Sequence, residues 1–181
     1  MLKPAILYRE EIQKKFAALK YTDAAMYYNG CIEDGRIWID DCEYGSIGVY
    51  QFAIVNGEDV VGFISWRTDY YSSVAYNFGL ISFTPDKPNV AIATAILSSI
   101  KMIQEQGIQH IEFGAVEGNP VIQHYDAITS RYTDDYIVQK ILIPFAFKDR
   151  KGSFHGRYLY LMLKKGSEES RSTTITFNDI L

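Results

Sequence analysis

The stretch over residues 79–125 constrains the fold of this chain more than any other. It contains, in order, the β-prone run Gly79-Leu80-Ile81-Ser82-Phe83, the turn Thr84-Pro85-Asp86, a long amphipathic segment, a second apolar run and the helix-start pair Asn119-Pro120. This order predicts strand, turn, helix, strand and helix start. Two helix N-termini then open at the same ends of two strands, and free backbone N–H groups at such places bind anionic ligands.

Hydrophobic periodicity predicts the remaining elements. Ile12, Phe16 and Leu19 indicate an amphipathic helix over 8–20, and Thr22 or Asp23 can cap a second short helix that ends near Asn29-Gly30. Strands are predicted over 47–55, 60–68, 74–83, 108–116, 136–147 and 157–163, with a hairpin turn at 56–59. Helices are predicted over 90–106 and 119–130. Residues 166–181 form a polar tail in which 174–177 can add a late strand or lack regular structure.

The predicted element order is α-α-β-β-β-α-β-α-β-β. A helix between the third and fourth strands implies a parallel crossover within an otherwise antiparallel sheet. We therefore expect one α/β (α+β) domain over residues 1–165, with helices on both faces of a mixed, mostly antiparallel sheet of about six to seven strands.

Composition argues against several classes of function. The net charge is -4 and no basic run is present, which disfavours nucleic-acid binding. No apolar run approaches the roughly 20 residues that span a bilayer, and the N-terminus leads into a charged helix, so we expect a cytoplasmic protein without membrane contact. Cys31 and Cys42 have no metal-site or CxxC spacing, and the three histidines are scattered. We expect reduced thiols and no metal.

The helix start at residues 85–95 resembles the cofactor signature of the GCN5-related N-acetyltransferase (GNAT) superfamily, Pro-Asp-x-Arg-Gly-x-Gly-x-Gly/Ala. Pro85-Asp86 matches in register, but Pro88 stands at the arginine position, and Asn89, Ala91 and Ala93 stand at glycine positions. The element order over 47–163 is also similar to that of the superfamily. The resemblance implies an acyl-CoA N-acyltransferase fold and an acetyl-CoA-dependent acetyltransferase. The alternative for this segment is a capped helix with a face of small residues.

The resemblance also implies cofactor contacts. The coenzyme A pyrophosphate would bind backbone N–H groups at the start of the helix, with Lys87 partly replacing the missing arginine. Backbone groups at the end of the preceding strand would pair with pantetheine, and one N–H there would polarise the thioester carbonyl. Asn119 would contact the pantetheine region, or serve only as a helix cap. The cofactor-binding residues expected are Leu80, Ile81, Ser82, Phe83, Lys87, Val90, Ala91, Ile92, Ala93, Thr94 and Asn119.

The implied reaction is direct attack of an uncharged primary amine on the thioester in a ternary complex. Tyr125 matches the residue that protonates the departing thiolate, with His124 as the alternative acid and a core tyrosine as the structural alternative. Glu112 is the candidate base, unless alternation places it on the outer face of its strand. The acceptor would be a small-molecule or peptide amine.

The acceptor side is less specific. The segment over 31–45 is acidic and would attract a cationic amine, or would simply be a solvated loop. Trp66, Tyr70, Tyr71 and Tyr76 can line the same cleft, pair across strands or form a dimer surface, and the last alternative would make the chain a homodimer. Two rival hypotheses stay open. One is a non-catalytic GNAT-fold interaction module that has lost the cofactor site, and the other is an acyl-CoA sensor without turnover.

Overall fold

The computed structural model describes residues 1–19, 21–22, 37, 39, 47–84, 89–148 and 152–167. Several predicted features lie outside these residues: the second short helix beyond Thr22, Cys31, Cys42, the acidic segment, Pro85 to Pro88 with Lys87, and the late strand over 174–177.

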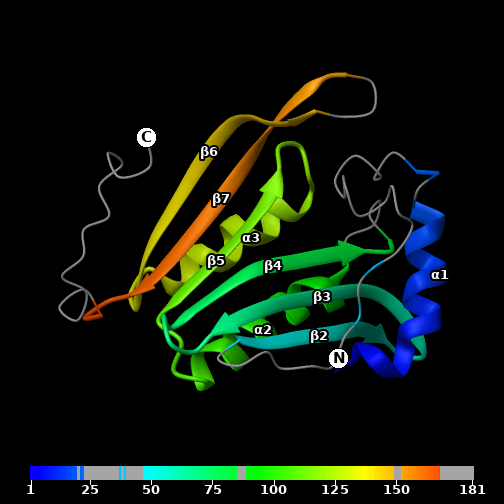
Figure 1. Cartoon of the computed structure of the whole chain (residues 1–181), viewed down its shortest axis with the longest axis horizontal. Coiled ribbons are helices and arrows are strands. Elements are labelled where there is room, and N and C mark those ends of the chain that lie inside the picture. The colour runs from blue at the N-terminus through cyan, green and yellow to red at the C-terminus, as the bar shows by residue number, and fades with distance from the viewer. Residues whose placement is uncertain are drawn as a thin grey trace.

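A seven-stranded sheet in the order β1-β2-β3-β4-β5-β7-β6 forms the centre of the molecule (Figure 1). Its strands are β1 Leu2–Pro4, β2 Ile47–Asn56, β3 Asp59–Asp69, β4 Val74–Ser82, β5 His110–Val116, β6 Tyr136–Lys148 and β7 Phe154–Lys164. Among the described strands, only β4 and β5 pair in parallel, and the other neighbours are antiparallel. The predicted single parallel crossover is therefore confirmed.

The strand β1 was not predicted. It is three residues long and pairs Leu2 with Ile54 at the far edge of the sheet. Three residues are too few to show a periodic pattern, so pairing with β2 alone defines this strand. The six other strands begin and end within three residues of the predicted positions.

The helices follow the predicted capping signals. A 3₁₀ turn, Ala5–Tyr8, leads into α1, Arg9–Leu19. The long helix α2 spans Val90–Glu105 and stops before Gly107, which has a φ of 75°. Helix α3 spans Val121–Thr129 and continues into a 3₁₀ turn, Ser130–Tyr132.

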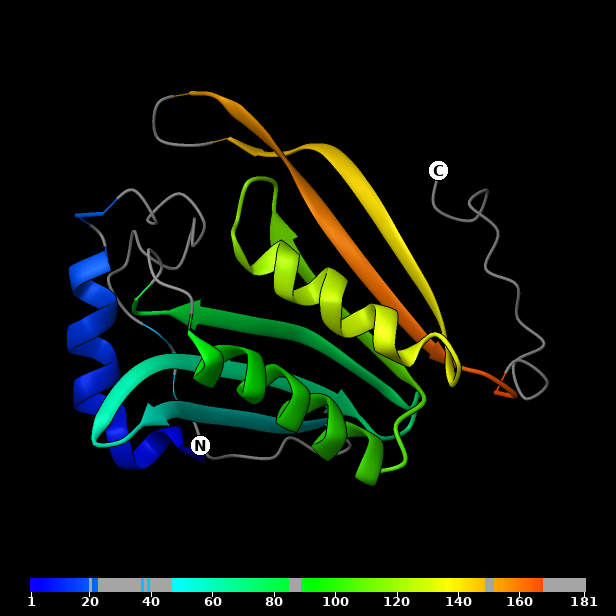
Figure 2. The ribbon, with the colours of Figure 1, turned by 180° about the vertical axis from the view of Figure 1, so that it is seen from behind.

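The two faces of the sheet have separate cores. On one side, which we call the α1 face, Ile12 and Phe16 pack on Ala53, Phe63 and Ile81. On the other side, the α2–α3 face, both later helices lie over the sheet (Figure 2). Helices thus cover both faces, as predicted.

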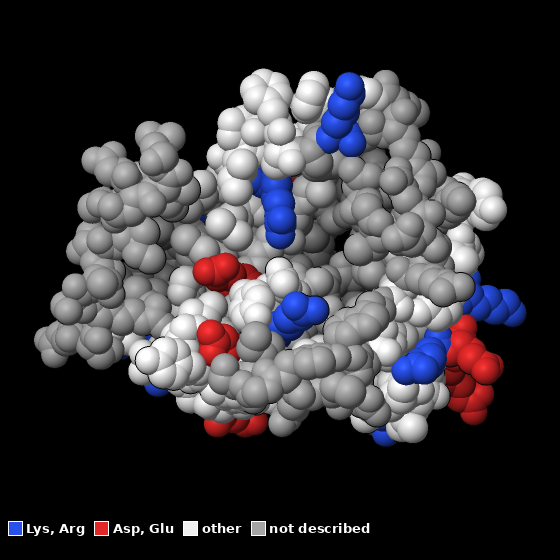
Figure 3. Space-filling model, in the orientation of Figure 1, with Lys and Arg blue, Asp and Glu red and all other residues white. Residues whose placement is uncertain are grey.

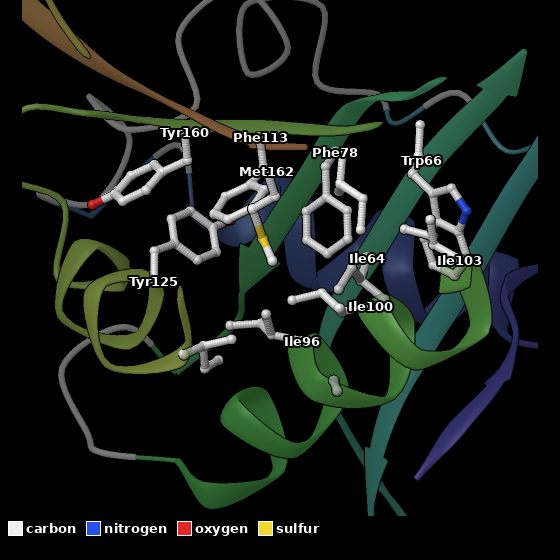
Figure 4. Close-up of a cluster of buried hydrophobic side chains, with 14 of the residues drawn as sticks. Ile64, Trp66, Phe78, Ile96, Ile100, Ile103, Phe113, Tyr125, Tyr160 and Met162 are labelled. Carbon is white, nitrogen blue, oxygen red and sulfur yellow. The ribbon is translucent and has the colours of Figure 1, made fainter. Parts of the chain in front are cut away.

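A row of aromatic rings crosses the sheet on the α2–α3 face (Figure 4). Its members are Tyr50, Phe52, Trp66, Phe78, Phe113, Tyr125 and Tyr160. Phe113 is central, with ring centroids 5.1 Å from Tyr160 and 4.7 Å from Tyr125. Each such pair contributes about 0.5–1.5 kcal/mol beyond area burial, so the row holds β3, β4, β5, β7 and α3 in a fixed relation.

The hairpin of β6 and β7 carries several exposed apolar side chains. Its pairing shifts between Ile143 and Phe147, a stretch that contains Pro144, which has no N–H, and Phe145, which has a φ of 54°. Phe145 is 75% exposed and meets Phe154 edge to face. Proline and an irregular register are common on edge strands. The homodimer stays a prediction. Within the described part of the chain, no helix is long and apolar enough to cross a membrane.

Candidate functional site

Strands β4 and β5 separate halfway along their length. They pair at Val74–His110, Ala75–Ile111 and Phe78–Phe113, and no pair follows. Tyr76 and Asn77 lie opposite the single residue Glu112, and Asn77 has a φ of 52°, so a bulge comes immediately before the last pair. Beyond it, β4 still pairs with β3 as far as Ser82. The sheet therefore opens on one side of β4 only, as the diverging ribbons in Figure 1 show.

The register with β3 indicates which backbone groups point into this opening. The N–H of Phe83 donates to the carbonyl of Val61 at 2.9 Å. Since residues of an antiparallel strand face their partner strand alternately, Ile81 also faces β3. Leu80 and Ser82 therefore direct their backbone N–H and C=O groups toward β5. Of the four predicted strand residues, these two have the orientation that pairing with an extended ligand requires.

The N-terminus of α2 lies beside the end of β4. The carboxamide oxygen of Asn89 accepts from the N–H of Ala91 at 2.9 Å, and its carbonyl accepts from Ile92 at 3.0 Å and Ala93 at 3.4 Å. Val90 is 82% exposed. Asn89 therefore uses several of the N–H groups that were predicted to hold phosphate. A phosphate could reach the N–H of Ala91 only by replacing the Asn89 side chain.

Asn119 caps α3 in the same way. Its carboxamide oxygen accepts from the N–H of Val121 at 3.0 Å, and its carbonyl accepts from Ile122 at 3.0 Å. Pro120 already has helical angles, φ -55° and ψ -23°. The predicted capping role is confirmed. The cap uses the side-chain oxygen of Asn119 and not its side-chain nitrogen, which can still contact a cofactor. That contact stays a prediction.

Tyr125 is a core residue in this structure. It is 1% exposed and meets Phe113 and Tyr160 edge to face on the α2–α3 face. His124 precedes it and is half-buried. This packing is that of a core tyrosine, the alternative to a catalytic role. The ring also lies beside β5, which borders the opening.

Glu112 lies on the opposite side of β5 from Tyr125. Successive residues of a strand alternate between faces, and Phe113 faces Tyr125, so Glu112 faces the α1 side. Its carboxylate oxygen is 3.5 Å from Nε2 of His110. The two residues that were predicted as acid and base therefore flank β5 from opposite faces.

Asp126 belongs to a polar cluster that the sequence analysis did not identify. Lys140 donates to both of its carboxylate oxygens at 2.8 Å, and the hydroxyl of Tyr160 donates at 2.7 Å. Partial burial would raise the pKa of Asp126, but these hydrogen bonds and the charge of Lys140 hold it below its ordinary value. Burial, then the bond to Asp126, raises the pKa of Tyr160. The cluster fastens α3 to β6 and β7, and no sequence pattern pairs these distant residues.

The remaining predicted residues do not share one face of the sheet. Trp66 is 1% exposed and lies in the aromatic row, whereas Tyr71 is 94% exposed. Tyr76 pairs with Arg67 on the α1 face. Among the described residues, no group of three or more His, Cys, Asp or Glu side chains is arranged to hold a metal ion.

No protein-family model matches this chain, and no curated protein matches its sequence. Its structure is nevertheless similar to solved acetyltransferases. A GCN5-related N-acetyltransferase from Kribbella flavida aligns with a TM-score of 0.65 and 16% identity, over 90% of this chain and 96% of that chain. An N-acetyltransferase from Staphylococcus aureus Mu50 aligns with a TM-score of 0.63 and 9% identity, over 90% and 97%.

A third structure, a ribosomal-protein-alanine N-acetyltransferase from Brucella melitensis, aligns with a TM-score of 0.59 and 9% identity, over 90% of this chain and 99% of that chain. For two further matches the chain spans only 62% and 58% of the solved chain. At these identities the likeness concerns the fold. The chain has the same fold as these N-acetyltransferases, an acyl-CoA N-acyltransferase-like fold, as predicted.

Proposed function

We propose that this chain is an N-acetyltransferase that transfers an acetyl group from acetyl-CoA to a primary amine. The observation that carries the proposal is the separation of β4 and β5 beyond Phe78 and Phe113. Leu80 directs its backbone groups into that opening. The start of α2 lies close to the end of the same strand, since the carboxamide nitrogen of Asn89 donates to the hydroxyl of Thr84 at 3.3 Å. An extended ligand with an anionic end fits this arrangement, in which β4 no longer pairs with β5 and a helix N-terminus lies close by.

In the proposed complex, pantetheine lies along β4 and the pyrophosphate lies at the start of α2. The helix dipole favours negative charge at that terminus, whose backbone N–H groups belong to Val90, Ala91, Ile92, Ala93 and Thr94. The carboxamide of Asn89 turns away from Ala91 when phosphate binds. Lys87 adds charge, and Asn119 contacts pantetheine from the start of α3.

The proposed reaction is a direct attack in a ternary complex. The amine nitrogen bonds to the thioester carbon, the C–S bond breaks, and the thiolate of CoA leaves. Glu112 accepts the proton that the amine loses, and Tyr125 protonates the thiolate, with His124 as the alternative acid. The N–H of Leu80 or Ser82 stabilises the oxyanion. Placement of the acid and the base on opposite faces of β5 supports this division of roles, because cofactor and acceptor then approach from different sides.

A second candidate function is a GNAT-fold module that does not catalyse transfer. Two observations favour it: Asn89 already caps α2, and Tyr125 is 1% exposed within an aromatic cluster. Such a module could bind a protein partner, or bind acyl-CoA without turnover. A cytoplasmic location and a homodimer remain predictions under either function.

Calorimetric titration of acetyl-CoA and CoA into wild-type protein, Val90→Glu and Val90→Lys tests the proposal. Val90 is 82% exposed, so neither substitution disturbs the core. A glutamate there interacts favourably with the helix dipole, so the variant keeps its stability while it repels the pyrophosphate. We expect binding in the wild type, at least tenfold weaker binding in Val90→Glu and equal or tighter binding in Val90→Lys, since a tenfold change requires only about 1.4 kcal/mol.

Thiol release measured with a panel of primary amines completes the test. Binding followed by release of CoA supports the enzyme. Binding without release from any amine favours the sensor, and the absence of any binding favours the interaction module.

A further inference from the structure

The guanidinium of Arg157 lies where β4 and β5 separate. Arg157 pairs with Val116 of β5 and Ile143 of β6, which places it on the α1 face of the sheet. Its side chain extends back over Gly114. A Cβ atom on Gly114 would be 3.0 Å from Nε and 3.2 Å from a terminal nitrogen of the guanidinium. Because Gly114 has no side chain, the guanidinium of Arg157 can lie directly over its backbone.

Gly114 is the first residue of β5 beyond the last pair with β4. The cation over it is consequently at the mouth of the opening. Within the described ranges, the side chain of Arg157 makes no hydrogen bond and no ion pair, and it is exposed. A guanidinium has five donors in a planar arrangement, which suits a carboxylate bound through two parallel hydrogen bonds.

Glu112 lies on the same face of β5, two residues before Gly114. At about 3.3 Å per residue, their Cα atoms are roughly 7 Å apart. The carboxylate of Glu112 and the guanidinium of Arg157 therefore lie on one face of β5, on either side of the last pair between β4 and β5. Other charged groups face the same side, namely Arg67 and Asp69 of β3 and, when protonated, His110. Figure 3 views the molecule from this side, and both basic and acidic side chains are seen over its middle.

The α1 face is also the side from which an acceptor would approach. Both helix N-termini that would hold the anionic cofactor belong to α2 and α3, which pack on the opposite face. A nucleophile must reach the thioester carbonyl from the side that the cofactor leaves open. Arg157 and Glu112 are therefore placed to contact the acceptor.

We propose that the acceptor is an amine that also carries a carboxylate, such as a free amino acid. Arg157 binds the carboxylate of the acceptor, and the amino group lies at Glu112, which accepts its proton as the nitrogen attacks. The Arg157 pair adds specificity because a planar guanidinium matches a carboxylate in geometry as well as in charge. This inference rests on the proposed transfer reaction and adds its substrate class.

The test compares acceptors that differ only in the carboxylate. The twenty common amino acids, β-alanine and γ-aminobutyrate are assayed with acetyl-CoA, each beside its carboxamide, by release of CoA thiol. We expect at least one free acid to exceed its carboxamide by roughly tenfold or more in kcat/KM, the size of a lost charge-assisted contact. In Arg157→Ala that advantage disappears through KM, because the free acid loses more than its carboxamide does. Arg157→Lys keeps part of the advantage.

A charge reversal at residue 157 adds a test in which a new preference is gained, so that the proposal does not depend on a loss of activity alone. Arg157→Glu should prefer the diamine cadaverine to lysine, the reverse of the wild type. Arg157 is exposed, and thermal denaturation confirms that each variant is folded. Equal use of acid and carboxamide by the wild type would overturn the inference while the transfer reaction stands. So would an equal loss for both acceptors in Arg157→Ala.

A carboxylate could also belong to the acyl group. The assay is therefore repeated with succinyl-CoA and a neutral amine. If Arg157→Ala impairs succinyl transfer and leaves the acceptor preference unchanged, the acceptor assignment is wrong. If acetyl-CoA binds and no amine of either kind is acetylated, the proposed function itself fails.

Discussion

Phe78 and Phe113 form the last pair between β4 and β5, and their ring centroids lie 5.8 Å apart at an interplanar angle of 53°. Both rings are at most 5% exposed. The point at which the sheet opens is therefore held by packing on the α2–α3 face. Beyond this pair the strands have no shared ladder to keep them together.

Substitution of Phe113 tests the importance of this packing for stability. Phe113→Ala removes a ring that contacts Phe78, Tyr125 and Tyr160, and we expect a loss of about 3–5 kcal/mol in the free energy of unfolding. Phe113→Leu, which keeps most of the volume, should cost less than half as much. Urea denaturation measures both. A loss below about 1 kcal/mol for the alanine variant would show that the neighbouring rings close the gap.

Asn89 offers a way to separate helix capping from phosphate binding. Asn89→Ala removes the cap of α2 and should lower the free energy of unfolding by about 0.5–2 kcal/mol. The same change frees the N–H of Ala91, so CoA binding should not weaken. Asn89→Asp keeps the cap but places a negative charge at the phosphate position. We expect nearly wild-type stability and weakened binding, measured by thermal denaturation and calorimetry. The proposed position of the pyrophosphate would be wrong if the aspartate variant bound CoA as tightly as the wild type.

The pKa of Asp126 is lowered in the folded protein, so its contribution to stability depends on pH. That contribution is present above its ordinary pKa of 3.8 and is lost as the pH falls through the lower folded value. Asp126→Asn should therefore be less stable than the wild type near neutrality. Because the pair with Lys140 is partly exposed, the difference should be on the order of 1 kcal/mol, and it should shrink below about pH 4.

Ionisation of Tyr160 should affect the stability of the protein at alkaline pH, whereas Asp126 acts at acid pH. Its pKa is raised, so its contribution is present below an ordinary value of 10.0 and is lost as the pH rises beyond it. Tyr160→Phe should abolish the loss of stability at alkaline pH. It should also reduce the dependence of stability on acid pH, because Asp126 loses one of its hydrogen-bond donors. Denaturation midpoints measured from pH 3 to pH 11 give both limbs. A difference between wild type and Asp126→Asn that does not vary with pH would contradict the assignment.

Tyr125→Phe keeps the aromatic packing and removes only the hydroxyl group. If Tyr125 protonates the thiolate, kcat should fall about 100-fold or more, the usual size of a general-acid contribution. Acetyl-CoA affinity should change little. His124→Gln is the matched variant for the alternative acid. A large fall in kcat for His124→Gln, with Tyr125→Phe nearly unaffected, would transfer the role to His124.

Local patterns predicted the elements well because local physics decides them. The spacing of apolar residues and the stop at Gly107 define α2, and the pair Asn119-Pro120 begins α3. The pair Asn56-Gly57 marks the hairpin between β2 and β3. The parallel pairing of β4 with β5 also followed, since a helix separates them and a short turn cannot join parallel strands.

The candidate site was only partly predictable. The sequence identified the end of β4, the two helix starts, Glu112 and Tyr125. It did not indicate that the side chain of Asn89 accepts a hydrogen bond from an N–H of α2, or that Glu112 and Tyr125 face opposite sides of β5. Whether a given strand residue faces one side or the other depends on register, and a shift of one residue exchanges the two faces.

The amino-acid sequence by itself determined which segments are helices and strands, because capping, turn chemistry and hydrophobic period act over a few residues. The tertiary structure alone decided the rest. It inserted β7 between β5 and β6, opened the ladder after Phe78, and laid the guanidinium of Arg157 over Gly114. These relations join residues that are distant in the chain, and they follow from the packing of whole strands and helices rather than from any local preference.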